Sequence, residues 1–323
     1  MSIDDITTAD QRVAQAYQSL CDARIDEAQA QLEEALAVYP QDSRLHVMSA
    51  ALAQSVGHPS NAMSHLWDAL AAEPGNELAS EELKLLTLTR LTDPRSIHKD
   101  FSLGSGERQT AEHAQHIRAD HRARYAMAAR WLRQTMGRDA WRMTGLDLFC
   151  GNGYGSHMLA QNAGVRMIGI DGSADAVTMA TRAYGSHRVQ FAHAIFPFEM
   201  TSGLFDFAVS FESIEHVDDS VGLLTQMAKA TDGPFILSVP NEPGLPFKHF
   251  GRRFEHHVRH FHREEIQSLL SQHGRRRIVA EYGQQVYRTS NHDIVGLLPE
   301  SEMGLRPFKE DVSQFLVLIA VCD

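Results

Sequence analysis

Cysteine, long apolar runs and positive charge are all scarce in this chain of 323 residues. The three cysteines, Cys21, Cys150 and Cys322, are scattered and odd in number, which argues against a disulfide framework and suits a reducing cytoplasm. No apolar run approaches the ~20 residues that cross a bilayer, and the acidic and polar first residues do not predict a signal peptide. We therefore expect a cytoplasmic protein without a membrane span.

Acidic residues outnumber basic ones, 41 to 30, which gives a net charge of −11. Such a chain has no bulk electrostatic attraction for nucleic acid or anionic membranes, and the arginine run at 275–277 is too short to reverse this. We expect no nucleic-acid partner. The 43% of hydrophobic residues suffices for a large α/β core and a smaller second unit.

The first part of the chain repeats itself at an offset of 34 residues. Small and apolar residues and a proline return one period later: Ala28, Leu32, Ala35 and Pro40 are repeated by Ala62, Leu66, Ala69 and Pro74. The period resembles the tetratricopeptide repeat, in which small residues let paired helices approach and proline ends the second helix. Ala16 and Ala50 depart from it, because glycine is usual there.

We expect residues 1–92 to form this all-α unit, with residues 77–91 as one further amphipathic helix. Its role is either to bind a protein partner or substrate, or to pack and dimerise, and the oligomeric state stays open. Residues 93–106 lose the helical pattern and contain Pro94, Gly104 and Gly106, which predicts a linker.

Residues 145–156 carry the most informative motif, a buried strand that runs into a glycine-rich loop and a helix. Gly151, Gly153 and Gly155 alternate, so a ligand can approach the backbone closely. A dinucleotide fingerprint would need glycine at Ser156, and Asp147 would repel a pyrophosphate. The same carboxylate suits the ammonium and sulfonium of S-adenosylmethionine, while a glycine turn without a ligand is the alternative.

Asp171 ends a second short apolar run and lies 20 residues beyond Gly151. At this spacing a second parallel strand delivers a carboxylate to ribose hydroxyls. A helix cap is the alternative, since Gly172 and Ser173 precede an expected helix. The occurrence of loop and acid together favours the ribose role.

Apolar runs alternate with helical segments along the rest of the chain: 145–149, 166–170, 188–192, 205–210 and 234–239. This alternation predicts a right-handed parallel α/β sheet. Two later runs, 277–282 and 314–322, are expected to form a final hairpin with only a loop between them and to add an antiparallel strand.

From about Gly106 to Cys322 the chain resembles the class I S-adenosylmethionine-dependent methyltransferases, in particular bacterial members linked to sugar and surface-glycan methylation. The matching segments are Gly106-Glu107-Arg108, His121, Arg124-Tyr125, 146–156, Asp171, 207–217, 238–241 and 257–261. The resemblance implies a Rossmann-like seven-stranded methyltransferase sheet over residues 107–323, with S-adenosylmethionine as methyl donor. Two departures are His260, where many relatives have an acid, and residues 191–195, which lack the acid that often contacts adenine; His193 or a backbone amide is left for that contact.

The resemblance also implies which residues hold the cofactor. They are Arg124, Tyr125, Asp147, Gly151, Asn152, Gly153, Tyr154, Gly155, Asp171, Gly172, Phe211 and Glu212. Arg124 is expected to pair with the carboxylate of the cofactor. The alternative places Arg124 on the surface of an amphipathic helix.

Candidate catalytic groups follow the fourth strand of the pattern. Glu212, Glu215 and His216 can cluster at one turn, and His216 is the expected general base because histidine titrates near neutral pH. Alternatively, Glu215 and His216 only hydrogen-bond the loop backbone. The similar Glu-x-x-Glu-His arrangement of small-RNA 2′-O-methyltransferases and some ubiquinone-pathway O-methyltransferases adds His257 as a fourth candidate. We expect no metal requirement, and a divalent cation on Glu212, Glu215, His216 and His257 is the alternative.

The sequence thus predicts an enzyme that methylates a hydroxyl of a small molecule or glycan by in-line transfer. One alternative keeps the enzyme but makes a protein side chain the acceptor, gripped by the repeats. The other is a non-catalytic scaffold with a degenerate methyltransferase fold.

Overall fold

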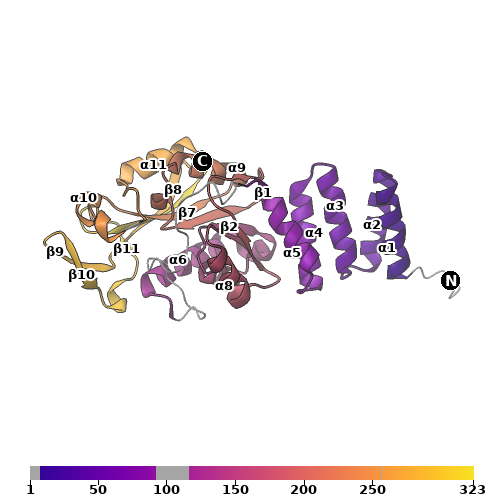
Figure 1. The fold of residues 1–323 in the computed structure, drawn as a ribbon, viewed down its shortest axis with the longest axis horizontal. Coiled ribbons are helices and arrows are strands. Elements are labelled where there is room, and N and C mark those ends of the chain that lie inside the picture. Colours follow the sequence, from indigo (N-terminus) through magenta and orange to yellow (C-terminus); the bar gives the residue numbers. More distant parts are fainter. Residues whose placement is uncertain (1–7, 92–115, 255) are drawn as a thin grey trace. The chain divides into compact units, whose positions relative to one another are not determined.

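The computed structural model describes residues 8–91, 116–254 and 256–323 (Figure 1). It divides into two compact units. The first is helical, runs to Thr87 and takes in Ser186–Arg188, and the second comprises Leu88–Gly185 and Val189–Asp323. The expected linker at 93–106 and the Gly106-Glu107-Arg108 motif lie outside the described residues.

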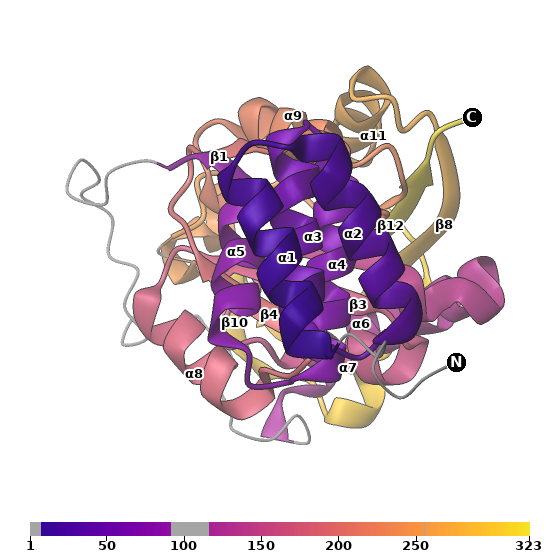
Figure 2. The same ribbon diagram turned by 90° about the vertical axis from the view of Figure 1, so that its right-hand side faces the viewer.

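Within the residues that the structure describes, the helical unit contains five helices that pack in chain order, each on the next (Figures 1 and 2). They are α1 (Ala9–Cys21), α2 (Ile25–Val38), α3 (Ser43–Ser55), α4 (Pro59–Ala72) and α5 (Glu77–Thr87). Helices α1 and α3 begin 34 residues apart, and so do α2 and α4. The period of the sequence is therefore also a period of the structure.

Local sequence explains where these helices begin and how closely they pack. Thr8 and Gln11 form a capping box at α1, Asp42 caps α3, and Pro59 occupies the first turn of α4. The repeated alanines are all fully buried, as expected of helix contacts: Ala28, Ala35, Ala62 and Ala69. The last helix was predicted four residues too long, because residues from Leu88 to Arg90 form β1, which pairs with β5 (Glu199–Met200).

The second unit is built on an eight-stranded sheet with the order β11-β8-β12-β7-β6-β2-β3-β4. Its strands are β2 (Thr144–Leu148), β3 (Arg166–Asp171), β4 (Val189–His193), β6 (Phe207–Phe211), β7 (Phe235–Pro240), β8 (Arg277–Gln284), β11 (Arg306–Pro307) and β12 (Phe315–Val321). Five neighbouring strands of this sheet are parallel to one another: β7, β6, β2, β3 and β4. Strand β12 is antiparallel to both β7 and β8. Seven of them correspond to the seven predicted runs, and the two-residue β11 is added at the edge. The predicted Rossmann-like sheet, parallel with an antiparallel strand added, is thereby confirmed.

Helices connect these strands and bury the sheet. They are α6 (Ala119–Met136), α7 (Tyr154–Ala163), α8 (Ala174–Tyr184), α9 (Ser220–Ala230), α10 (Phe247–Phe250) and α11 (Arg263–Gln272), with the 3-10 turns η5 (Gly137–Arg142), η6 (Ile214–His216), η7 (Gly251–Arg253) and η8 (Glu300–Glu302). Every residue of β2, β3, β6 and β7 is buried, which explains why these strands read as continuous apolar runs. Among the helices in the described ranges, none has both the length and the apolar character needed to cross a membrane.

The expected final hairpin was partly wrong. Strands β8 and β12 do pair antiparallel, but the segment between them folds into β9 (Tyr287–Ser290) and β10 (Asp293–Leu297), shown in gold in Figure 1, before η8 and β11. Strand β12 then enters between β7 and β8. The connecting segment is long enough to form its own two-stranded sheet, so it is more than a loop.

The topology brings the predicted site residues to one edge of the sheet. The chain leaves β2 toward β3 and β4 and returns to β6 on the other side of β2, which makes the boundary between β2 and β6 the switch point. In open α/β sheets, ligands bind at the carboxyl ends of the strands at this point. Gly151 lies three residues after the end of β2, Asp171 is the last residue of β3, and Glu212 directly follows β6.

Candidate functional site

The glycine loop joins β2 to α7 through backbone with positive φ at Phe149, Gly151 and Gly153. A Cβ on Gly153 would overlap the ring of Phe191 and lie 2.8 Å from Cβ of Ala180, and one on Gly155 would overlap the ring of Tyr125. A Cβ on Gly151 would meet nothing within 4 Å. Gly153 and Gly155 therefore permit close internal packing, and Gly151 is the glycine of the three that faces open space.

The carboxylate of Asp171 connects the end of β3 to this loop. One oxygen accepts the amide of Gly151 at 2.8 Å, and the other accepts the amide of Ser173 at 2.8 Å. Ser173 is the N-cap of α8, with its hydroxyl accepting the amide of Ala176 at 3.2 Å, so the cap alternative for Asp171 was wrong. On the neighbouring strand, His193 Nε2 lies 3.1 Å from the carbonyl of Gly172. The ribose contact of Asp171 stays a prediction.

Asp147 lies fully buried beneath the loop, within β2. Ser156 Oγ donates to it at 2.7 Å, and the hydroxyl of Tyr125 lies 3.3 Å from each of its oxygens. Burial raises the pKa of Asp147 to about 7, and the two hydroxyl donors limit the rise. Ser156, which departs from the dinucleotide fingerprint, is thus a direct partner of Asp147, whose predicted contact with an ammonium stays a prediction.

Arg124 on α6 is 1% exposed, so its expected alternative as a surface residue was wrong. Its Nε donates to Gln284 Oε1 at 2.7 Å, and its guanidinium lies 4.9 Å from the centre of the Phe315 ring. The terminal nitrogens approach Glu212 and Asp120 at 3.6 and 3.7 Å. Neither of them makes a hydrogen bond with the described residues. The two terminal nitrogens of this buried guanidinium can therefore still donate hydrogen bonds to a ligand.

An aromatic cluster next to Arg124 brings together three of the predicted cofactor residues. The ring of Tyr125 meets Phe211 and Tyr154 edge-on, with centroids 4.8 and 5.6 Å apart. The hydroxyl of Tyr154 lies 3.1 Å from His121 Nδ1, and burial lowers the pKa of His121 to about 3. His121 is therefore neutral near pH 7. The cluster holds α6 against the start of α7.

The turn after β6 separates the two glutamates that the sequence grouped together. Glu212, at φ 51°, accepts the hydroxyl of Ser238 on β7 at 2.6 Å. Glu215 in η6 is completely buried, and neither of its carboxylate oxygens makes a hydrogen bond with the described residues. Burial raises the pKa of Glu215 well above its usual value, and the charge of Glu212 raises it further. Burial without a cation therefore favours the protonated form of Glu215.

The histidines beside Glu215 have tautomers that their neighbours fix. Since a carbonyl only accepts, His260 donates from Nδ1 to Leu245 O at 2.6 Å, which leaves the lone pair on its Nε2. His257 Nδ1 lies 3.0 Å from that Nε2 and must donate to it. His216 donates from Nδ1 to the carbonyl of His256 at 3.2 Å. Both His216 and His257 consequently carry their lone pair on Nε2.

This cluster tests the predicted metal ligands by geometry. Ligand atoms of Glu215, His216 and His257 lie within 4.8 Å of one another, and two imidazoles with one carboxylate are a donor set that suits a divalent cation. Glu212 does not join this group, because Ser238 and Arg124 hold its carboxylate. Of the four candidate ligands, the structure brings together three.

The surroundings of Arg124 contain groups that the sequence did not predict. Asp120, Gln284 and Phe315 come from the start of α6 and from the last two long strands. No motif marks them, since Gln284 and Phe315 reach Arg124 only through the pairing of β8 with β12. Ser238 was included in a predicted segment, but its bond to Glu212 was not foreseen.

Comparison with known proteins identifies related sequences and folds. Residues 116–287 match the family model described as a methyltransferase domain. No curated protein matches this sequence. Among solved structures, an S-adenosylmethionine-dependent methyltransferase of Thermotoga maritima is similar, with 18% identity, 63% of this chain and 91% of that chain covered, and a TM-score of 0.42. The magnesium protoporphyrin IX methyltransferase of Synechocystis, with S-adenosylmethionine bound, is 18% identical over 72% of this chain and 98% of its own, with a TM-score of 0.47.

Proposed function

The chain belongs to this methyltransferase family, which matches more than half of its length, and we propose that its acceptor is a hydroxyl group of a small molecule or glycan. Membership of this family confirms the activity and the cofactor that the sequence predicts: the protein is an S-adenosylmethionine-dependent methyltransferase. The acceptor is our proposal, and the arrangement of His216 carries it.

S-adenosylmethionine supplies a methyl group activated by its sulfonium sulfur. We propose that the open face of Gly151 and the carboxylate of Asp171 hold its adenosine part, and that Arg124 binds its carboxylate. The terminal nitrogens of Arg124 support this assignment: both are buried and make no hydrogen bond with the described residues, and the nearest carboxylates, of Glu212 and Asp120, lie 3.6 and 3.7 Å away. A charged ligand group would satisfy them, since buried donors are rarely left unpaired.

His216 supplies the base that an aliphatic hydroxyl needs. Such a hydroxyl holds its proton far more tightly than a phenol does, so a positioned base accelerates its methylation more. The bond from His216 Nδ1 to His256 O leaves the lone pair on Nε2, which would accept the hydroxyl proton. The rings of His216 and His257 meet edge-on with centroids 4.7 Å apart, which restricts the orientation of His216.

A divalent cation on Glu215, His216 and His257 is the second candidate for this activation. The buried Glu215 carboxyl makes no hydrogen bond with the described residues, and this favours a cation, which would ionise that group and neutralise its charge. In this case the cation would lower the pKa of the acceptor hydroxyl, and the same Nε2 atoms would serve as ligands.

Transfer of a labelled methyl group tests the acceptor class. Purified protein and labelled S-adenosylmethionine are added to cell extract separated into small-molecule, glycan and protein fractions. We expect label in the small-molecule or glycan fraction, in a linkage that resists mild base, as a methyl ether does. Label in the protein fraction would support the alternative in which the helical repeats bind a protein target, and base-labile label would identify a carboxyl acceptor; either result contradicts the proposal.

A further inference from the structure

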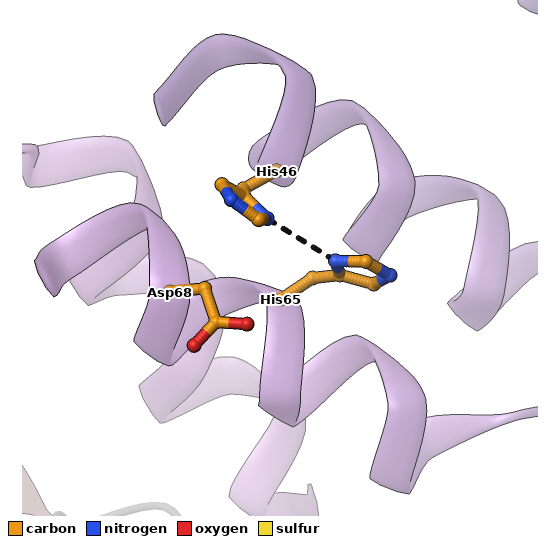
Figure 3. Close-up of side chains that lie close together, drawn as sticks. All are labelled: His46, His65 and Asp68. Carbon is orange, nitrogen blue, oxygen red and sulfur yellow. Dashed lines mark hydrogen bonds between the residues drawn. The ribbon is translucent and has the colours of Figure 1, made fainter. Parts of the chain in front are cut away.

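A second histidine cluster lies in the helical unit and shares no residue with the site described above. His46 on α3 faces His65 and Asp68 on α4 (Figure 3). One ligand atom from each of the three residues lies within 4.8 Å of the others. His65 and Asp68 are three residues apart, which places them on one face of α4. Two neighbouring helices therefore direct two imidazoles and a carboxylate toward one point.

A hydrogen bond to a backbone carbonyl fixes the orientation of the His46 ring. Its Nε2 lies 3.0 Å from the carbonyl of Pro40, so Nε2 carries the proton and donates it there. The lone pair is consequently on Nδ1, the atom that faces His65. Histidines that bind metals usually donate their other ring N–H to a carbonyl or carboxylate in this way.

The distance between the two rings fits a shared cation. His46 Nδ1 and His65 Nδ1 are 3.3 Å apart, so in the absence of a cation His65 can donate a hydrogen bond to the lone pair of His46 (Figure 3). Two nitrogens bound to tetrahedral zinc at about 2.0–2.1 Å lie roughly 3.3–3.4 Å from each other. The pair is already spaced as zinc ligands are.

The first helical repeat has different residues at the positions equivalent to His46, His65 and Asp68. Shifting each residue back by the 34-residue period gives Arg12, Gln31 and Glu34 in place of His46, His65 and Asp68. Arg12 forms an ion pair with Glu34 at 3.3 Å. In the first repeat the guanidinium supplies the positive charge between the paired helices.

We propose that His46, His65 and Asp68 bind a zinc-like divalent cation that joins α3 to α4, where the first repeat uses Arg12. Imidazole and carboxylate donors suit Zn²⁺ and its neighbours in the transition series. His46 is buried whereas His65 and Asp68 are half-buried, so the remaining coordination positions face outward, toward water or a donor from a partner. This site is independent of the methyl-transfer chemistry.

Titration of the full chain with Zn²⁺ tests the site. The variant His46→Arg/His65→Gln/Asp68→Glu copies the first repeat into the second and is therefore expected to fold. By calorimetry, the wild type should bind one more equivalent of Zn²⁺ than this variant, and Zn²⁺ should raise the melting temperature of the wild-type helical unit more. Replacing only a group that supports a metal ligand weakens binding by about 10- to 100-fold, so His65→Gln alone should lower the affinity at least as much.

Two controls make the result decisive. His58→Gln removes an exposed histidine of the same unit and should bind Zn²⁺ as the wild type does. The Glu215, His216 and His257 group remains in all these variants, so any Zn²⁺ that it binds cancels in the comparison. Equal stoichiometry and affinity in the wild type and in His65→Gln, with equal helix content by circular dichroism, would overturn the proposal.

Discussion

One oxygen of Asp171 accepts the amide of Gly151 at 2.8 Å, so a side chain at the end of β3 fixes the loop that follows β2. Its other oxygen accepts the amide of Ser173 at the start of α8. A carboxylate has about four acceptor positions, and we propose that a ribose hydroxyl donates to one of them. Asp171 is therefore expected to shape the loop and to bind the cofactor.

Replacing Asp171 by Asn puts an NH₂ group against one of the two amides that the carboxylate now accepts. Hydrogen bonds to charged groups contribute about 1.5–3 kcal/mol each, so we expect the Kd for S-adenosylhomocysteine to rise by about tenfold or more. Calorimetry measures this. Asp175→Asn, which changes an exposed acid in the first turn of α8, should bind as the wild type does; equal affinity of the two variants would refute the assignment.

Two neighbouring glycines should respond differently to alanine. Gly153→Ala forces a methyl group into the ring of Phe191, so we expect loss of about 2 kcal/mol or more of folding stability. Gly151→Ala meets no atom and should cost only the ~1–2 kcal/mol of its positive φ, but its methyl would occupy space meant for the ligand. Urea unfolding and calorimetry distinguish them. A folded Gly151→Ala protein with wild-type affinity for S-adenosylhomocysteine would show that this face is not the ligand side.

Arg124→Gln should weaken the binding of S-adenosylmethionine while leaving the affinity for adenosine alone unchanged. The reason is that Arg124 is assigned to the carboxylate, which adenosine lacks, and we expect a rise in Kd of about tenfold or more. Arg122→Gln is the matched control, since Arg122 lies on the same helix in an exposed ion pair with Glu300. If both ligands lose affinity equally, Arg124 supports the fold of the site and does not bind the carboxylate.

The buried carboxyl of Asp147 should lower the free energy of unfolding as the pH rises. Its pKa is about 7 when folded and about 3.9 when unfolded, so the folded state binds the proton more tightly. Between pH 4 and 7 the unfolded state loses that proton first, and the free energy of unfolding falls. Relative to the wild type, Asp147→Asn should therefore gain stability between pH 4 and 8, by up to about 4 kcal/mol. Urea unfolding at a series of pH values measures this; parallel curves would contradict it.

Variants of His216 and Glu215 distinguish activation of the hydroxyl by a general base from activation by a cation. As general base, His216→Gln should lower kcat by about 10²- to 10⁴-fold with little change in the KM for S-adenosylmethionine. If His216 acts without a metal, Glu215→Gln, which replaces the buried carboxyl by an amide of similar shape, should keep most of the activity, and a chelator should have no effect. Loss of activity in Glu215→Gln, together with inhibition by chelator that Mg²⁺ or Zn²⁺ reverses, would instead establish the cation.

The sequence predicted those parts of the fold that depend on residues close to one another in the chain. The glycine loop and the acid at the end of β3 were recognisable because a strand, a turn and a helix start leave a short signature. The insertion of β12 between β7 and β8 left no such mark, because strand order depends on pairing between distant segments. The burial of Arg124 was left open for the same reason: its partner Gln284 lies 160 residues away.

The central claim is that the Gly151 loop, Asp171 and Arg124 form the S-adenosylmethionine site, and a calorimetric titration with S-adenosylhomocysteine tests it most directly. We predict binding at a single site with a Kd of about micromolar, near −8 kcal/mol, and no binding by a folded Asp171→Ala variant. Absence of heat for the folded wild-type protein, or unchanged affinity in Asp171→Ala, would contradict this assignment.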